Sequence, residues 1–246
     1  MSVTWIRRED VPLSSLASFD ECELLPGSYP LVRAFRGRLN AGSNHTFAAA
    51  DARCFHVYCF TEGLGCALTS KRVFPLEGLC FLVPDPTQGF SLAAVQTLEY
   101  TRFEVHMLDS DLREWNETHC ILPWFKTLET SEPYWQSCKS ENTQSWYVIC
   151  RKLLPRTIMG VVRAQGPGRE GTSEPGHPNV AQWNVMLPGS DIELTVEEET
   201  VPHRYGDFSY VPAGAPHSLI SLPGKLNYYI WFEHFVRELD GPSWQP

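Results

Sequence analysis

The sequence predicts an all-β protein built from two barrels in tandem, and two observations support this prediction. Short apolar runs rich in Val, Phe, Tyr and Leu are separated by 19 prolines and 17 glycines, a pattern typical of short strands joined by turns. The second half of the chain repeats the first in length and rhythm, and such duplication is stronger evidence than any single strand assignment. A chain of 246 residues can hold two small β domains, each with its own core.

Residues 1–107 are expected to form the first barrel. Its strands are predicted from six apolar runs: Leu31–Phe35, Cys54–Phe60, Cys66–Leu68, Leu79–Val83, Phe90–Leu92 and Tyr100–His106.

Residues 108–155 are expected to be a connector with one amphipathic helix. Apolar side chains recur at helical spacing between Gln144 and Leu154, at Trp146, Ile149, Cys150 and Leu153. The sequence therefore predicts a helix there that packs against a barrel.

Residues 156–246 are expected to form the second barrel. Strand signals return in six runs: Ile158–Arg163, Gln182–Leu187, Ile192–Val196, Phe208–Val211, Ser218–Leu222 and Leu226–Phe235. Aromatic residues at strand spacing are expected to build the core or line a cavity: Trp183, Tyr210, Tyr229 and Trp231. Arg163, Asn184 and His234 are polar side chains that could project into this barrel.

Composition narrows the classes of partner. A formal net charge of −9, from 29 acidic and 20 basic residues, would repel a phosphate backbone and makes nucleic acid an unfavourable partner. No stretch has the length of apolar sequence that a membrane span requires. The eight cysteines include no C-x-x-C pair, and the first residues lack an apolar signal core, so we expect a soluble cytoplasmic protein with reduced thiols. Exposed strands of such barrels often pair, so a homodimer is expected.

Two segments of the second half carry a candidate metal site. The first is a glycine turn at Gly206, a short strand, a Pro-x-Gly turn from Pro212 to Gly214 and then His217. The second contains His177, Gln182 and Gly189. In a small antiparallel barrel the inward positions of neighbouring strands converge on one cavity, and two imidazoles with one oxygen donor form a common open metal site.

These two segments resemble the paired signature motifs of the cupin superfamily, whose members have a jelly-roll (double-stranded β-helix) barrel of the RmlC-like type. The resemblance implies that His177, Gln182 and His217 bind a divalent metal: Mn, Fe, Ni or Zn. Gln182 stands where the motif has glutamate, and Pro175 stands where it has its first histidine. Glu174 is a carboxylate that could replace the missing ligand. The alternative is a barrel that has lost its metal, in which His177 and His217 are ordinary polar side chains.

The first barrel matches the cupin motifs less well. His56 occupies the glutamate position, with six residues between it and Gly63, and Gln88 ends the segment that resembles the second motif. His45 lies too far upstream to pair with them. We therefore expect a metal-free barrel with a structural role, and a lone histidine in a strand is more often a core residue than a ligand.

The layout of one silent barrel and one metal-bearing barrel is similar to that of ureidoglycine aminohydrolases and sugar-acid-processing bicupins. It implies a metal-dependent isomerase or hydrolase that acts on a small polar metabolite such as a sugar acid or a ureide, with Glu174 or His203 moving the proton. One alternative is a non-catalytic cupin that binds a small molecule such as a sugar. A non-haem iron dioxygenase is less favoured, because the motif lacks the carboxylate of the usual iron triad.

Overall fold

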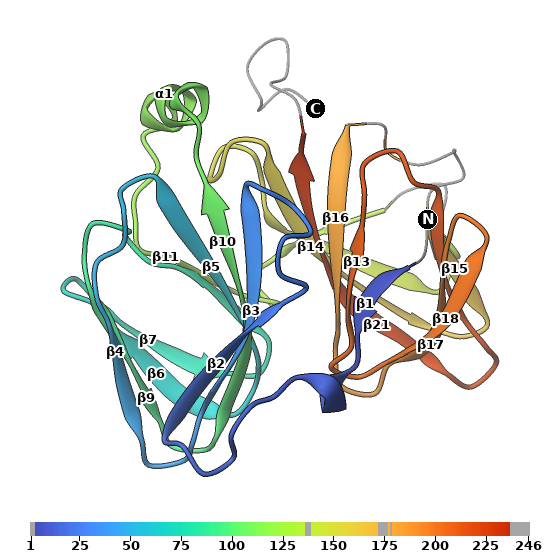
Figure 1. The fold of residues 1–246 in the computed structure, drawn as a ribbon, viewed down its shortest axis with the longest axis horizontal. Helices are drawn as coiled ribbons and strands as arrows, with labels where there is room; N and C mark the ends of the chain where they lie inside the picture. The colour runs from blue at the N-terminus through green and yellow to red at the C-terminus, as the bar shows by residue number, and fades with distance from the viewer. Residues whose placement is uncertain (1–2, 136–138, 172–176, 178, 237–246) are drawn as a thin grey trace. The chain divides into compact units, whose positions relative to one another are not determined.

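A computed structural model describes residues 3–135, 139–171, 177 and 179–236, and it divides the chain into two compact units. Barrel 1 is Val11–Thr130, and barrel 2 combines Met1–Asp10 with Ser131–Pro246. In Figure 1 the strands of barrel 1 are coloured blue to green, and those of barrel 2 yellow to red apart from the blue first strand. The predicted all-β class with two barrels is confirmed.

Barrel 1 consists of two antiparallel sheets and one helix. Its elements are β2 (Phe19–Leu24), β3 (Val32–Leu39), β4 (Asn44–Phe47), β5 (Cys54–Glu62), β6 (Leu64–Leu68), β7 (Val73–Glu77), β8 (Cys80–Val83), β9 (Phe90–Ala94), β10 (Leu98–His106), α1 (Asp109–Thr118) and β11 (Trp124–Thr127). The sheet orders are β11-β8-β5-β10-β3-β2 and β4-β9-β6-β7. Alternate side chains of both sheets, among them Tyr58, Leu76, Leu92 and Tyr100, form one core cluster.

Barrel 2 repeats this plan. Its elements are β1 (Thr4–Ile6), η1 (Arg8–Asp10), β12 (Glu132–Tyr134), β13 (Thr143–Ile149), β14 (Thr157–Gln165), β15 (Gly168–Gly171), β16 (Val180–Met186), β17 (Asp191–Val196), β18 (Glu199–Arg204), β19 (Phe208–Val211), β20 (His217–Ser221) and β21 (Leu226–Phe235). The sheet orders are β1-β19-β16-β21-β14-β13-β12 and β15-β20-β17-β18. Its core includes Met186, Leu194, Leu219, Tyr229 and Trp231.

The expected domain boundaries differ from the observed units, because the connector is divided between the barrels. β11 pairs with β8 and extends barrel 1, whereas β12 and β13 extend a sheet of barrel 2 next to β14. Residues 1–10, expected in the first barrel, belong to barrel 2 because β1 pairs with β19, with Trp5 opposite Ser209.

The helix predicted between Gln144 and Leu154 is wrong. Thr143–Ile149 is strand β13, paired with β14, and Leu153 follows in a turn whose amide donates to the Cys150 carbonyl. The run of Trp146, Tyr147, Val148 and Ile149 is aromatic and β-branched, and a neighbouring strand was available to pair with it.

The helix of this region is α1 instead. Asp111 caps it by accepting a hydrogen bond from the Leu108 amide at 2.8 Å, and Trp115 packs on Phe55 of β5. Its sequence, DSDLREWNET, contains too few apolar residues to give a periodic signal. Among the described residues, no helix is long and apolar enough to span a bilayer.

Candidate metal centre

The structure brings the three predicted metal ligands together in barrel 2. Gln182 lies in β16 and His217 begins β20, and Gln182 Oε1 lies 3.1 Å from His217 Nε2. The ring centroids of His177 and His217 are 6.0 Å apart. Gln182 and His217 are buried, whereas the His177 side chain is 42% exposed. The group therefore runs from the barrel interior to its surface.

Local backbone contacts hold His217 beside the strand that carries Gln182. The Pro-x-Gly turn closes with a hydrogen bond from the Ala215 amide to the Pro212 carbonyl, and Gly214 adopts the left-handed φ of +84°. The Gly214 amide also donates to the carbonyl of His177 at 2.9 Å. This turn therefore connects the two histidine-bearing segments directly.

The orientation of the His217 ring leaves its Nε2 lone pair facing Gln182. Nδ1 lies 3.2 Å from the Ala215 carbonyl, which can only accept, so Nδ1 carries the proton. Burial, together with the nearby His177, lowers the pKa of His217 to about 4 despite the opposing Ala215 hydrogen bond, so the ring is neutral near pH 7. A neutral ring protonated at Nδ1 presents Nε2 as an acceptor or as a metal ligand.

Gln182 presents a second acceptor to the same point. Its Nε2 donates to Asn184 Oδ1 at 2.8 Å, and this leaves Oε1 directed at the His217 lone pair. Two adjacent ligands bound at right angles to one cation at about 2.1 Å lie about 3 Å apart, close to this separation. The pair therefore fits a bound cation. Rotation of the Gln182 and Asn184 amides, which would make Gln182 a donor to His217, is the alternative arrangement.

A carboxylate that the sequence analysis missed lies beside His177 and across from Gln182. Glu233 lies on β21 directly opposite Gln182, and its Oε1 is 3.9 Å from His177 Nε2. Burial raises its pKa to about 7, and the positive charges of Lys139 and Arg151 oppose that shift. The sequence does carry a signal for Glu233, because it directly follows the aromatic run Tyr228–Phe232. A carboxylate in such a buried strand needs a polar or charged partner.

An aromatic and cationic group surrounds the Glu233 side of the site. Tyr134 and Tyr147 stack at 3.9 Å between ring centroids, and both meet the edge of Trp231. Lys139 Nζ donates to Tyr134 Oη at 2.9 Å and to Ser145 Oγ at 2.8 Å. The positive charge of Lys139 opposes the rise that burial causes in the pKa of Glu233, so Lys139 lies close to that carboxyl group.

The structure does not place either expected proton-transfer residue, Glu174 or His203, beside His177, Gln182 and His217. Glu174, like Pro175, lies outside the described residues. His203 lies opposite Ile192 on β17, four residues from Val196, which pairs with His217; this is about 13 Å along the strand. It is fully buried against Trp5, and its Nε2 has no hydrogen-bond partner in the described part of the chain. This placement favours a structural role for His203.

The other polar side chains considered for this barrel divide into two groups. Asn184 is buried and extends the Gln182 network to Ser209, and His234 is buried with Nδ1 3.2 Å from Thr157 Oγ1. Arg163 is exposed and lies over the Tyr228 ring, so it does not enter the barrel.

Comparison with known proteins gives matches in structure alone. No family model and no curated protein matches the sequence. A protein from Pseudomonas aeruginosa described as glyoxylate-induced matches with a TM-score of 0.77 at 12% identity, over 97% of this chain and 91% of that one.

Two oxalate decarboxylase structures also match. A single-residue variant of the Bacillus subtilis enzyme has a TM-score of 0.73 at 12% identity, over 97% of this chain and 79% of its own. The Lactobacillus farciminis enzyme in complex with formate has a TM-score of 0.71 at 12% identity, over 97% and 87%. At this identity the matches show the fold and not the activity. Over nearly its whole length the chain therefore has the bicupin fold of these structures, which is the fold that its motifs predicted.

Proposed function

We propose that barrel 2 is the active barrel of a metal-dependent enzyme that acts on a small anionic metabolite, such as a sugar acid or a ureide. The observation that carries this proposal is the pair of facing acceptors, Gln182 Oε1 and His217 Nε2, 3.1 Å apart with His177 and Glu233 beside them. Imidazole, amide and carboxylate donors together suit Mn, Fe, Ni or Zn.

Each residue of the site has a role in this proposal. His177, Gln182, His217 and Glu233 hold the cation, and the Ala215 carbonyl fixes the His217 ring. A cation bound there would polarise a substrate carbonyl or carboxylate.

Other residues would handle the substrate. Lys139 supplies positive charge for an anionic group, and the rings of Tyr134 and Tyr147 exclude water from one side. Glu174 is the proposed proton carrier. The names of the structural neighbours include glyoxylate, oxalate and formate, which are small carboxylates, and this agrees with an anionic substrate.

The test is metal analysis of the full chain purified without a histidine tag. We expect His217→Ala to lose one equivalent of metal relative to the parent protein, because it removes the buried Nε2 ligand. The control is His119→Ala, at an exposed histidine in barrel 1, which should keep the parent metal content. Equal metal content in parent and His217→Ala would refute the proposal.

The same purified protein tests two further candidate functions. If the amides of Gln182 and Asn184 are rotated, the site can form hydrogen bonds to a ligand without a metal. Binding of a sugar acid in calorimetry, by a protein with no metal in barrel 2, would identify a non-catalytic binding protein. The dioxygenase is less favoured because the motif lacks a carboxylate, but Glu233 lies 3.9 Å from His177 and could supply one if it moved towards His217. Dioxygen consumption by the iron-loaded protein would identify this third function.

A further inference from the structure

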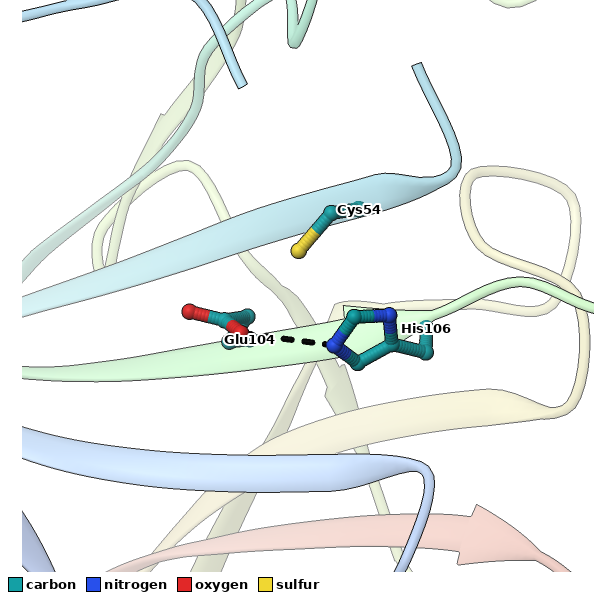
Figure 2. A group of neighbouring side chains, drawn as sticks. All are labelled: Cys54, Glu104 and His106. Carbon is teal, nitrogen blue, oxygen red and sulfur yellow. Dashed lines mark ion pairs between the residues drawn. The ribbon is translucent and has the colours of Figure 1, made fainter. Parts of the chain in front are cut away.

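A second group of metal-ligand side chains lies in barrel 1, on one face of β5 and β10. Tyr58 and Tyr100 belong to the barrel core, so the residues of the same parity on these strands share the core-facing side. Towards one end of the strands this row changes from aromatic to polar, with Cys54 and His56 on β5 and Glu104 and His106 on β10. Figure 2 shows Cys54 directed from its strand towards Glu104 and His106 on the neighbouring one.

The strand register gathers these four side chains into a compact quadrilateral. His56 lies opposite Glu104, and Cys54 lies opposite His106. Cys54 Sγ is 3.6 Å from His56 Nε2, which is 3.7 Å from Glu104 Oε2. His106 Nε2 is 3.3 Å from Glu104 Oε1, and the ligand atoms of Cys54, Glu104 and His106 all lie within 4.8 Å of one another.

We propose that Cys54, His56, Glu104 and His106 form a zinc site in barrel 1. Tetrahedral zinc, with a sulfur ligand at about 2.3 Å and nitrogen or oxygen ligands at about 2.0–2.2 Å, places neighbouring ligand atoms about 3.3–3.6 Å apart. Three of the six ligand separations are close to these values, at 3.6, 3.7 and 3.3 Å, and the last two end on different oxygens of Glu104. His56 is not among the three residues whose ligand atoms all lie within 4.8 Å of one another, so its side chain must move when the cation binds. One thiolate among imidazole and carboxylate ligands favours zinc over hard cations.

The surrounding charges accommodate a dication. Glu104 accepts from Arg102 and Arg33, which also pair with Glu21 and Glu23 respectively. Three carboxylates and two guanidinium groups leave one excess negative charge beside the site. Zinc with a thiolate brings one positive charge and neutralises the network. The guanidinium groups would then act as hydrogen-bond donors that orient the ligating carboxylate.

This site is not a copy of the candidate centre in barrel 2. Cys54 and Val180 stand nine residues before Gly63 and Gly189, and both glycines have a positive φ. His56 is therefore the counterpart of Gln182, and the strand register likewise makes Glu104 the counterpart of Glu233.

The other two ligands have no counterpart in barrel 2. Val180 and Phe235 stand where barrel 1 has Cys54 and His106. Four protein ligands fill a tetrahedral shell, so the zinc would be structural and would join β5 to β10. His106, with 45% of its side chain exposed, offers the cation a route from solvent.

Cobalt(II) is the probe that separates this site from barrel 2. The test uses the full chain without a histidine tag and carrying His217→Ala, so that the barrel 2 site is disabled. We expect one equivalent of Co²⁺ to give a sulfur-to-cobalt charge-transfer band together with intense visible bands of four-coordinate geometry. Because the barrel 2 donors include no sulfur, failure of the proposed function would not change this band. Zn²⁺ should displace Co²⁺ and remove the absorption.

Two variants and two matched controls locate the site. Cys54→Ser should abolish the charge-transfer band, and His106→Gln should weaken Co²⁺ binding at least about tenfold. Cys66→Ser and His119→Gln, at a cysteine and an exposed histidine elsewhere in barrel 1, should leave both unchanged. Far-ultraviolet circular dichroism shows whether each variant is folded. If Cys54→Ser does not fold, His106→Gln still tests the site, because the half-exposed His106 side chain can be replaced without disturbing the core. A missing band in the parent, or a band that survives Cys54→Ser, would overturn the proposal.

Discussion

The buried His203 predicts a specific dependence of stability on pH. Its side chain has no exposed surface and packs against Trp5, and its Nδ1 lies 3.4 Å from the Pro202 carbonyl. Burial lowers its pKa to about 4, with a small opposing effect of that carbonyl, whereas an unfolded histidine titrates near 6.5. Protonation therefore favours the unfolded chain. The contribution of the neutral His203 ring to the free energy of unfolding is fully present above pH 6.5 and is lost as the pH decreases towards 4.

The magnitude follows from the two pKa values. The full difference corresponds to about 3.4 kcal/mol, of which about 1.8 kcal/mol is lost between pH 7 and pH 5. In His203→Leu, an apolar side chain of similar size replaces the titrating ring and its unpaired Nε2. The free energy of unfolding from urea titrations should then fall by about 1.8 kcal/mol less over this interval than in the parent, whereas His119→Gln should follow the parent. Parallel curves for His203→Leu and the parent would show that the buried ring does not titrate as argued.

Three other substitutions test the site and the packing. Gln182→Glu restores a charged ligand and should increase the metal that barrel 2 retains during dialysis against a chelator, measured by mass spectrometry; unchanged retention would argue against coordination by this side chain. Glu233→Gln should lower retention at least about tenfold in the same assay, with Glu197→Gln, on an exposed turn, as the control. Gly160→Ala would drive a methyl group into the Trp231 indole and should lower the free energy of unfolding by about 3 kcal/mol, whereas Gly168→Ala, with neighbours no nearer than 3.4 Å, should cost much less; equal losses would contradict this packing argument.

The duplicated architecture was predictable from sequence because its signals are local. Gly206, the Pro212–Gly214 turn and His217 lie within twelve residues, and each residue type reports on its own backbone. The structure places this segment as the motif predicts, with His217 next to Gln182. The wrong helix at 144–154 shows the limit of local reasoning, since a few apolar residues can match helical spacing by chance while pairing with β14 decides the outcome.

The remaining parts of both sites depend on pairing between distant strands. Glu233 meets Gln182 across 51 residues, and Glu104 meets His56 across 48, and only the register brings each pair together. The sequence predicts a metal-free first barrel because neither Cys54 nor His56 indicates what the opposite strand carries. Once the register is known, Cys54 groups with Glu104 and His106, and His56 lies opposite Glu104.

The pairing of β1 with β19 has a consequence for biosynthesis. Barrel 1 is continuous in the chain and can fold on the ribosome as soon as its residues have emerged. The partner of β1 is translated about 200 residues later, so the first strand stays unpaired until all of barrel 1 and most of barrel 2 have been synthesised. If the chain is cut after residue 130, the two fragments should therefore differ in behaviour. The upstream fragment contains all of barrel 1, whereas the downstream fragment lacks β1 and exposes the edge of β19 to intermolecular pairing.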